Sequence, residues 1–212
     1  MNMPVAAALG AFAGYLIGGI PFGLIVGRLA GVRDVREYGS GKIGFTNSLR
    51  TLGMKWAMLV VAGDISKGVA AVLVGRLLLN EPWAAALAGM AAVLGHIYPV
   101  YAGFRGGRGV STAFGAFLAV SWPAALAVVT FSLLVLYLFR YASLMSVVGV
   151  FVGFVVVIAL VATGDLANPY AVFAIGTMFA VEISHRGNIR RLLAGTEPKL
   201  GQGGTRRVPG AS

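Results

Sequence analysis

Long apolar stretches separated by short polar segments make up most of the chain. A membrane-spanning helix needs about 20 mostly apolar residues, and six stretches meet this requirement, beginning near Val5, Trp56, Trp83, Pro123, Leu144 and Pro169. A further stretch, Val110 to Val120, is apolar but short. It ends just before Pro123, and a proline readily occupies the first turn of a new helix. The pattern therefore predicts an all-α membrane bundle with six or seven spans.

The distribution of positive charge decides between these two counts. Cytoplasmic loops of membrane proteins carry an excess of Lys and Arg. With seven spans and the N-terminus outside, every Lys and Arg faces the cytoplasm except Lys67, within a span, and Arg76, near the outer end of the same span. Six spans would place a large basic group outside. We therefore predict seven transmembrane helices, an external N-terminus and a cytoplasmic C-terminus.

Composition supports a membrane protein and narrows its ligands. Of the 212 residues, 58% are hydrophobic and 11% are charged, and no long polar linker divides them. We expect one domain over residues 1–201, a disordered basic tail over 202–212, and a first apolar stretch that is retained rather than cleaved. The net charge of +10 fits cytoplasmic loops, anionic lipid and anionic substrates better than nucleic acid. With no cysteine and two histidines, we expect neither a metal nor a cofactor.

Three glycine- and arginine-rich segments share the cytoplasmic face in this topology. The first, residues 38–53, contains Ser40-Gly41, Asn47 and Arg50, and glycine N–H groups with such side chains can surround an anion. Its Gly39 to Gly44 stretch formally fits a dinucleotide-binding pattern, but it follows a membrane helix rather than a strand, so we reject that reading. The alternative is a flexible basic loop lying on anionic lipid.

The second segment, residues 95–112, places Arg105-Gly106-Gly107-Arg108 just before an apolar helix. Helix starts and paired arginines both favour phosphate, although an ordinary positively charged turn explains the same residues.

The third segment, residues 185–197, combines His185 and Asn188 with arginines directly after the last span. A histidine can bind phosphate or move a proton, whereas the arginines also fit a simple charged stop to the final helix. Glu197 is expected to pair with one of them. Within the second span, Asp64 and Lys67 share a helix face, either as functional groups or as a structural bridge.

Taken together, the segments GSGKIGFTNSLRTLG, GHIYPVYAGFRGGRGVST and HRGNIRRLLAGTE resemble the three motifs of the bacterial acyl-phosphate:glycerol-3-phosphate acyltransferase family, PlsY. The resemblance extends to about Gly201 and includes the Asp64 to Gly68 stretch. Lys42 stands where the family normally has Asn, Phe45 where it has Ala, and Arg105 and Arg108 where it usually has Lys. These departures affect details of donor binding more than the reaction class.

The resemblance implies a bacterial inner-membrane enzyme of phospholipid biosynthesis, with its active site facing the cytoplasm. It would transfer a fatty acyl group from acyl phosphate to the 1-hydroxyl of glycerol 3-phosphate, giving lysophosphatidic acid and phosphate. The acyl-phosphate head is expected on Ser40, Gly41, Asn47, Gly106 and Gly107. Glycerol 3-phosphate is expected on Arg50, Arg108, His185 and Asn188. The residues expected to be catalytic are Ser40, Arg50, Arg108 and His185.

Two questions of mechanism and function stay open at this level. The proton of the attacking hydroxyl goes either to His185 or to a substrate phosphate, and a covalent acyl-Ser40 intermediate is the less favoured route. The expected partners are both substrates, membrane lipid and the enzyme that makes acyl phosphate. The rival function is a transporter of organic phosphate anions, against which the absence of an inverted repeat counts. A structural protein that binds anionic lipid is the third reading.

Overall fold

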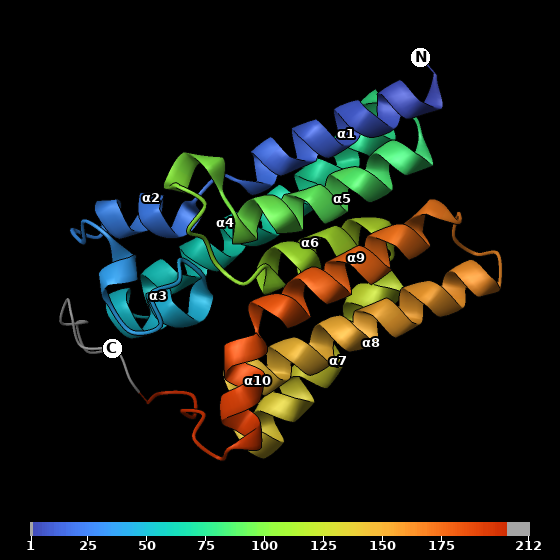
Figure 1. Cartoon of the computed structure of the whole chain (residues 1–212). Coiled ribbons are helices and arrows are strands. Elements are labelled where there is room, and N and C mark those ends of the chain that lie inside the picture. The colour runs from blue at the N-terminus through green and yellow to red at the C-terminus, as the bar shows by residue number, and fades with distance from the viewer. Residues whose placement is uncertain (1, 203–212) are drawn as a thin grey trace.

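In the computed structural model, residues 2–202 are described, and within them the chain forms helices and no β-strand. Long helices run alongside one another, with α2, α3 and α10 gathered at one end of the bundle (Figure 1). The α-helices are α1 Met3–Gly18, α2 Phe22–Leu29, α3 Phe45–Leu52, α4 Met54–Leu73, α5 Pro82–Ile97, α6 Val110–Val120, α7 Trp122–Phe139, α8 Ala142–Ala162, α9 Pro169–Ser184 and α10 Arg186–Leu193. Two 3₁₀ turns, Val35–Glu37 and Val100–Ala102, and a π-helical turn, Val74–Leu78, complete these elements.

All the apolar stretches singled out in the sequence are helical, which confirms the all-α class. Five segments are long and apolar enough to cross a membrane: Met3–Leu29, Met54–Leu78, Pro82–Ala102, Trp122–Phe139 and Ala142–Ala162. The α6 and α9 helices are apolar but shorter. The α1 helix begins at the end of the bundle opposite to α10 (Figure 1). Seven crossings therefore remain a prediction, built on five long helices and two short ones.

The α1 and α5 helices pack backbone to backbone. Gly10, Gly14 and Gly18 recur every fourth residue and so lie on one face of α1. A Cβ added at any of them would lie 2.1–2.5 Å from a backbone oxygen of α5. Small residues permit this close approach. The resulting van der Waals contacts stabilise helix pairs in a membrane, where the hydrophobic effect does not drive helices together.

A second close contact joins α4 to α6 and matters for the site. Gly68 of α4 lies against the carbonyl of Thr112, and Gly115 of α6 lies against the carbonyl of Ile65. A side chain at either glycine would meet that carbonyl oxygen at 2.1 Å. The start of α6 is consequently held beside the charged stretch of α4.

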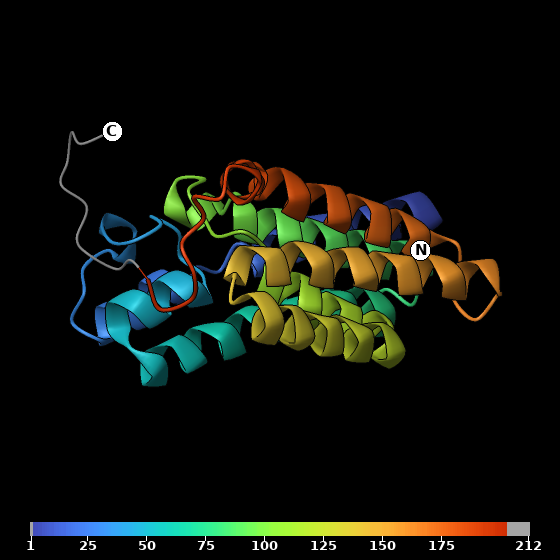
Figure 2. The same cartoon turned by 90° about the horizontal axis from the view of Figure 1, so that it is seen from below.

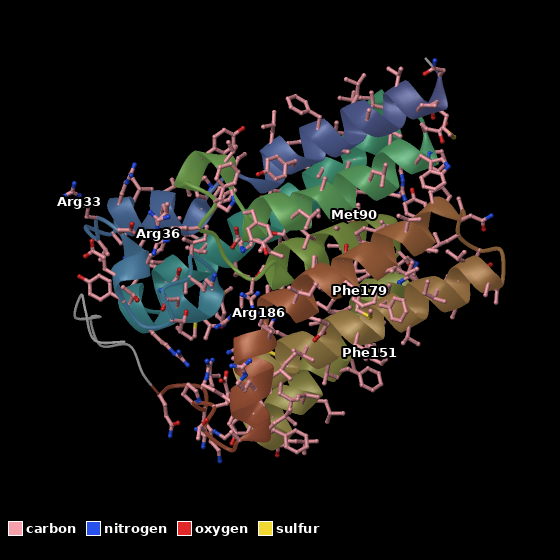
Figure 3. All side chains as sticks on the ribbon, viewed as in Figure 1. Arg33, Arg36, Met90, Phe151, Phe179 and Arg186 are labelled. Carbon is pink, nitrogen blue, oxygen red and sulfur yellow. The ribbon has the colours of Figure 1, made fainter. Side chains whose placement is uncertain are left out.

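Charged and apolar side chains separate along the bundle. Arg33 and Arg36 lie at the end with α2 and α3, whereas Phe151 and Phe179 lie on the apolar helices α8 and α9 (Figure 3). Both phenylalanines are about half exposed, at 51% and 55%. Figure 2 shows the loops and α3 extending beyond the long helices at the same end. This arrangement suits a bundle whose flank faces lipid and whose charged end faces water.

The predicted tail, 202–212, lies outside the described residues except for Gln202. That residue closes a turn, since its backbone N–H donates to the carbonyl of Lys199 at 3.0 Å.

Candidate active site

A cavity of about 480 Å³ opens at the charged end of the bundle, where the three glycine- and arginine-rich segments meet. Six of the predicted site residues line it: Ser40, Asn47, Arg50, Arg108, His185 and Asn188. Gly41, Gly106 and Gly107 are not among its lining residues. Residues as far apart in sequence as Gly39 and Pro198 therefore line one pocket.

Hydrogen bonds fix the three segments to one another. The Arg36 guanidinium, in the turn just before the first segment, donates to the carbonyls of Ala102 and Arg105 at 2.9 and 3.3 Å, which ties that turn to the second segment. Asp34 holds the same guanidinium through a 2.7 Å ion pair. The Ser184 hydroxyl at the end of α9 donates to the carbonyl of Arg108 at 3.0 Å. The cavity wall is thus built before any ligand enters.

Asn47 organises the first loop from within. Its buried side chain accepts a hydrogen bond from the Ser40 N–H and donates one to the carbonyl of Val35, both at 2.8 Å. The Gly41 N–H donates to the carbonyl of Tyr38 at 3.0 Å. Because both backbone N–H groups already have partners, this loop presents the Ser40 hydroxyl rather than a nest of free N–H groups.

Gly106 and Gly107 wrap the second loop around His96. Their N–H groups donate to the carbonyls of Ile97 and His96 at 3.2 and 3.1 Å. A Cβ at Gly107 would lie 2.0 Å from His96 Nε2, so only glycine fits against this ring. In this structure the glycine pair shapes the loop that leads to Arg108, and its expected contact with the acyl-phosphate head stays a prediction.

The start of α6 also lies at the cavity. Gly109 has a φ of +87° and turns the chain into the helix, which begins at Val110. Gly109, Val110 and Ser111 line the cavity. The first-turn N–H groups of a helix lack partners within the helix and attract anions.

Two arginines, Arg50 and Arg108, line the cavity and take part in none of the ion pairs of the described residues. The Nε atoms of Arg50 and Arg108 are buried and have no hydrogen-bond partner within residues 2–202. Burial, together with the nearby charges of Arg191 and Arg50, lowers the pKa of Arg108 despite the opposing attraction of Glu197. Buried unpaired donors are rare in proteins because they are costly. Such an arrangement favours binding of an anion.

His185 is buried and neutral. Its Nδ1 lies 2.9 Å from the carbonyl of Val181, and since a carbonyl can only accept, Nδ1 carries the proton. Burial first, and then the charge of Arg108, lowers the pKa of His185 to about 4. The remaining ring atom, Nε2, is an acceptor available to a ligand.

Asn188 and Arg191 of α10 are fixed by Glu197. The carboxylate accepts from Asn188 Nδ2 at 2.6 Å and from Arg191 Nε at 2.7 Å. Burial opposes ionisation of Glu197, but the neighbouring side chains of Ser143, Asn188 and Arg191 outweigh it and lower its pKa. The predicted pairing of Glu197 with an arginine is confirmed, and the partner is Arg191.

The charged pair of the second span proves to be part of a buried bridge. Lys67 Nζ lies 2.8 Å from Asp64 Oδ1 and donates to the carbonyl of Ile20, at the break between α1 and α2, at 2.9 Å. His96 Nδ1 lies 3.3 Å from the same Asp64 oxygen. Asp64 and His96 also line the cavity, so the bridge forms part of its inner wall.

Sequence reasoning missed the contribution of α8. Ala142, Ser143, Met145 and Ser146 line the cavity from the first turn of this helix. Two serines three residues apart at the start of an otherwise apolar helix were the available signal. Within residues 2–202, no group of His, Asp and Glu side chains is arranged to hold a metal ion.

Fold and cavity together define an integral membrane helical protein with a basic site at one end. The chain belongs to the glycerol-3-phosphate acyltransferase family, whose sequence profile matches residues 8–195. A glycerol-3-phosphate acyltransferase of Dinoroseobacter shibae is 42% identical over 198 residues, covering 93% of this chain and 95% of its relative. One of Brucella canis is 46% identical over 191 residues, covering 90% and 92%.

Solved structures agree with this assignment. The crystal structure of PlsY, an integral membrane glycerol 3-phosphate acyltransferase, in its glycerol 3-phosphate form is 37% identical. It superposes with a TM-score of 0.83 and covers 92% of this chain and 96% of that one. The lysophosphatidic acid form gives a TM-score of 0.81. The protein is therefore an acyltransferase of phospholipid synthesis, as the three motifs indicated.

Proposed function

We propose that the protein transfers a fatty acyl group from acyl phosphate to the 1-hydroxyl of glycerol 3-phosphate, releasing lysophosphatidic acid and inorganic phosphate. The observation that carries this proposal is a pair of buried guanidinium Nε atoms in one cavity, those of Arg50 and Arg108, which have no hydrogen-bond partner among the described residues. Structures of PlsY in a glycerol 3-phosphate form and a lysophosphatidic acid form support the acceptor and the product.

The acceptor phosphate is assigned to Arg50 and Arg108. Guanidinium groups bind phosphate through paired, directional hydrogen bonds, and within residues 2–202 neither of these two forms an ion pair. His185 Nε2 accepts a hydrogen bond from an acceptor hydroxyl. Asn188, whose amide nitrogen is held by Glu197, offers its oxygen to the same substrate.

The donor phosphate is assigned to the Ser40 hydroxyl and the first turn of α6. Gly41 and Asn47 act by shaping the Ser40 loop, and Gly106 and Gly107 act by placing Arg108. Phe45, Val110 and Met145 are apolar residues lining the same cavity, and they mark where the acyl chain would leave it. Phe45 fills space that a smaller residue would leave open, which makes it a determinant of donor fit.

Acyl phosphate is a mixed anhydride, so positioning and stabilisation of anions suffice for catalysis. The acceptor oxygen attacks the acyl carbon, the bond from that carbon to the phosphate oxygen breaks, and inorganic phosphate leaves. A phosphate with a second pKa of about 6 accepts the hydroxyl proton more readily than His185, whose pKa is about 4. His185 therefore binds and orients, and the substrate supplies the base.

The topology proposed with this function has seven crossings of the bacterial inner membrane, with α6 and α9 as short spans. It supports a cytoplasmic active site, because the cavity lies at the end rich in Lys and Arg. The enzyme that makes acyl phosphate is the expected partner, because direct transfer of this reactive donor between the two enzymes would limit its hydrolysis.

The test is to incubate purified protein with palmitoyl phosphate and labelled glycerol 3-phosphate. We expect lysophosphatidic acid and phosphate in equal amounts, and no product when palmitoyl-CoA replaces the donor. Arg50→Gln should lower kcat/KM by about 100-fold, whereas Arg33→Gln, an exposed arginine at the same end, should not. Product from palmitoyl-CoA alone would overturn the donor assignment, and uptake of glycerol 3-phosphate into proteoliposomes without conversion would favour a transporter.

A further inference from the structure

A second cavity lies at the other end of the bundle from the candidate active site. Its volume is about 430 Å³, and it is formed around the junction of α6 and α7 at Ser121. The active-site cavity lies at the first residues of α6 and this one at its last residues. An 11-residue helix at 1.5 Å per residue separates them by about 16 Å. We refer to the second space as the outer cavity.

Arg76 enters the outer cavity from the π-helical turn Val74–Leu78 that continues α4. Single π-helical turns are uncommon and occur often at functional sites. The guanidinium donates to the Tyr170 hydroxyl at 3.2 Å and lies 5.9 Å from the centre of its ring. Within residues 2–202 this is its one hydrogen bond, so the side chain is oriented while other donors stay available.

Asp165 brings the opposite charge to the same cavity. Its carboxylate accepts a hydrogen bond from the Thr163 hydroxyl at 2.5 Å. None of the ion pairs formed by the described residues joins Asp165 to Arg76. Two opposite charges held apart in one cavity are complementary to a ligand that carries both charges.

Apolar residues extend from this charged pair toward the flank of the bundle. Leu118 and Trp122, which line the cavity, are 44% and 69% exposed. Tryptophan is enriched where lipid headgroups meet acyl chains. The positive-inside pattern gives no reason for an arginine at this end, so Arg76 requires another explanation.

We propose that the outer cavity binds one zwitterionic phospholipid with an ammonium headgroup. The lipid phosphate lies on the Arg76 guanidinium and the ammonium on the Asp165 carboxylate, while the acyl chains follow Leu118 and Trp122. A purely anionic headgroup would satisfy Arg76 but would meet the negative charge of Asp165. The site is independent of the acyl-transfer chemistry and of the residues assigned to it.

The test uses the full chain in nanodiscs containing equal amounts of phosphatidylethanolamine and phosphatidylglycerol. The protein is released into mild detergent, and retained lipid is counted by native mass spectrometry. We expect one retained phosphatidylethanolamine per protein, reduced about tenfold by Arg76→Gln and by Asp165→Asn. Arg76→Lys keeps the charge and should keep part of the binding, which guards against a loss caused only by misfolding.

Two controls separate this site from other lipid contacts. Arg33→Gln removes an exposed arginine at the opposite end and should leave retention unchanged. Arg108→Gln should also leave it unchanged, because that arginine belongs to the other cavity. Retention of both lipids without preference, or loss in Arg108→Gln but not in Arg76→Gln, would overturn the proposal.

Discussion

Two groups of buried charges line the same cavity, and they differ in how they are neutralised. On the inner wall, Asp64 contacts both Lys67 and His96, and Lys67 also bonds to a backbone carbonyl. Elsewhere in the lining, Arg50 and Arg108 have buried Nε atoms with no hydrogen-bond partner among the described residues. Both groups contain buried atoms without a hydrogen-bond partner in the described residues, Asp64 Oδ1 and Oδ2 among them. The difference is in ion pairing: Asp64 has opposite or titratable partners at 2.8 and 3.3 Å, whereas no ion pair of the described residues involves Arg50 or Arg108.

This difference separates charges that stabilise the fold, those of Asp64 and Lys67, from charges suited to binding a substrate, those of Arg50 and Arg108. Removing one member of a closed buried pair leaves an uncompensated charge, which destabilises a protein strongly. Removing an unpaired arginine relieves repulsion in the free protein and weakens only the complex. Stability and activity should therefore respond in opposite ways to changes in the two groups.

The largest expected effect is on stability, from Asp64→Asn. The variant keeps the size of the side chain but leaves Lys67 without its carboxylate, so we expect a loss of about 3–5 kcal/mol in the free energy of unfolding. Denaturation in mixed micelles measures this loss. Asp34→Asn is the matched control, because its ion pair with Arg36 is partly exposed and should contribute at most about 1 kcal/mol. Equal losses in both variants would contradict the comparison.

The next effect is on catalysis, from Arg108→Gln. We expect kcat/KM for glycerol 3-phosphate to fall by about 100- to 1,000-fold, since a buried charged contact to phosphate is lost. The free energy of unfolding without substrate should not fall, because repulsion from Arg50 and Arg191 is relieved. Arg105→Gln, an exposed arginine of the same loop, should leave both quantities close to normal. A loss of stability as large as that of Asp64→Asn would mean that Arg108 is part of the scaffold.

The smallest effect is a pH dependence that reports His185. Its pKa of about 4 in the folded protein lies below the ordinary value of 6.5. Between these values the unfolded chain binds a proton that the folded chain does not, so stability falls as pH decreases. From pH 7 to pH 5 we expect a loss of about 2 kcal/mol that is absent in His185→Gln.

His96 is present in both proteins, so the difference between their pH profiles isolates His185. At neutral pH the variant should keep near-normal kcat with a raised KM for glycerol 3-phosphate, as expected of a binding residue. A kcat that collapses while KM is unchanged would instead make His185 the base.

The sequence predicted the helical elements and the three cavity segments well, because both depend on local features. Runs of apolar residues determine where helices form, and clustered glycines and arginines mark the loops between them. The cavity-lining positions of Ser40, Asn47, Arg50, Arg108, His185 and Asn188 match the residues singled out.

Other features could not be derived from local patterns. The start of α8 enters the cavity because α8 packs beside α9 and α10, a contact that no motif records. Nothing in the sequence indicated that the Gly107 N–H donates to the carbonyl of His96, or that its missing side chain makes room for the imidazole.

By itself, then, the sequence determined an all-helical membrane protein, the segments that form its site and the family to which it belongs. Only the tertiary structure decided which charges are paired. Asp64 meets His96 from another helix, 32 positions along the chain, whereas neither Arg50 nor Arg108 forms an ion pair within residues 2–202. The physical reason is that hydropathy is a property of neighbouring residues, while neutralisation of a buried charge depends on whatever side chains the fold brings within a few ångströms.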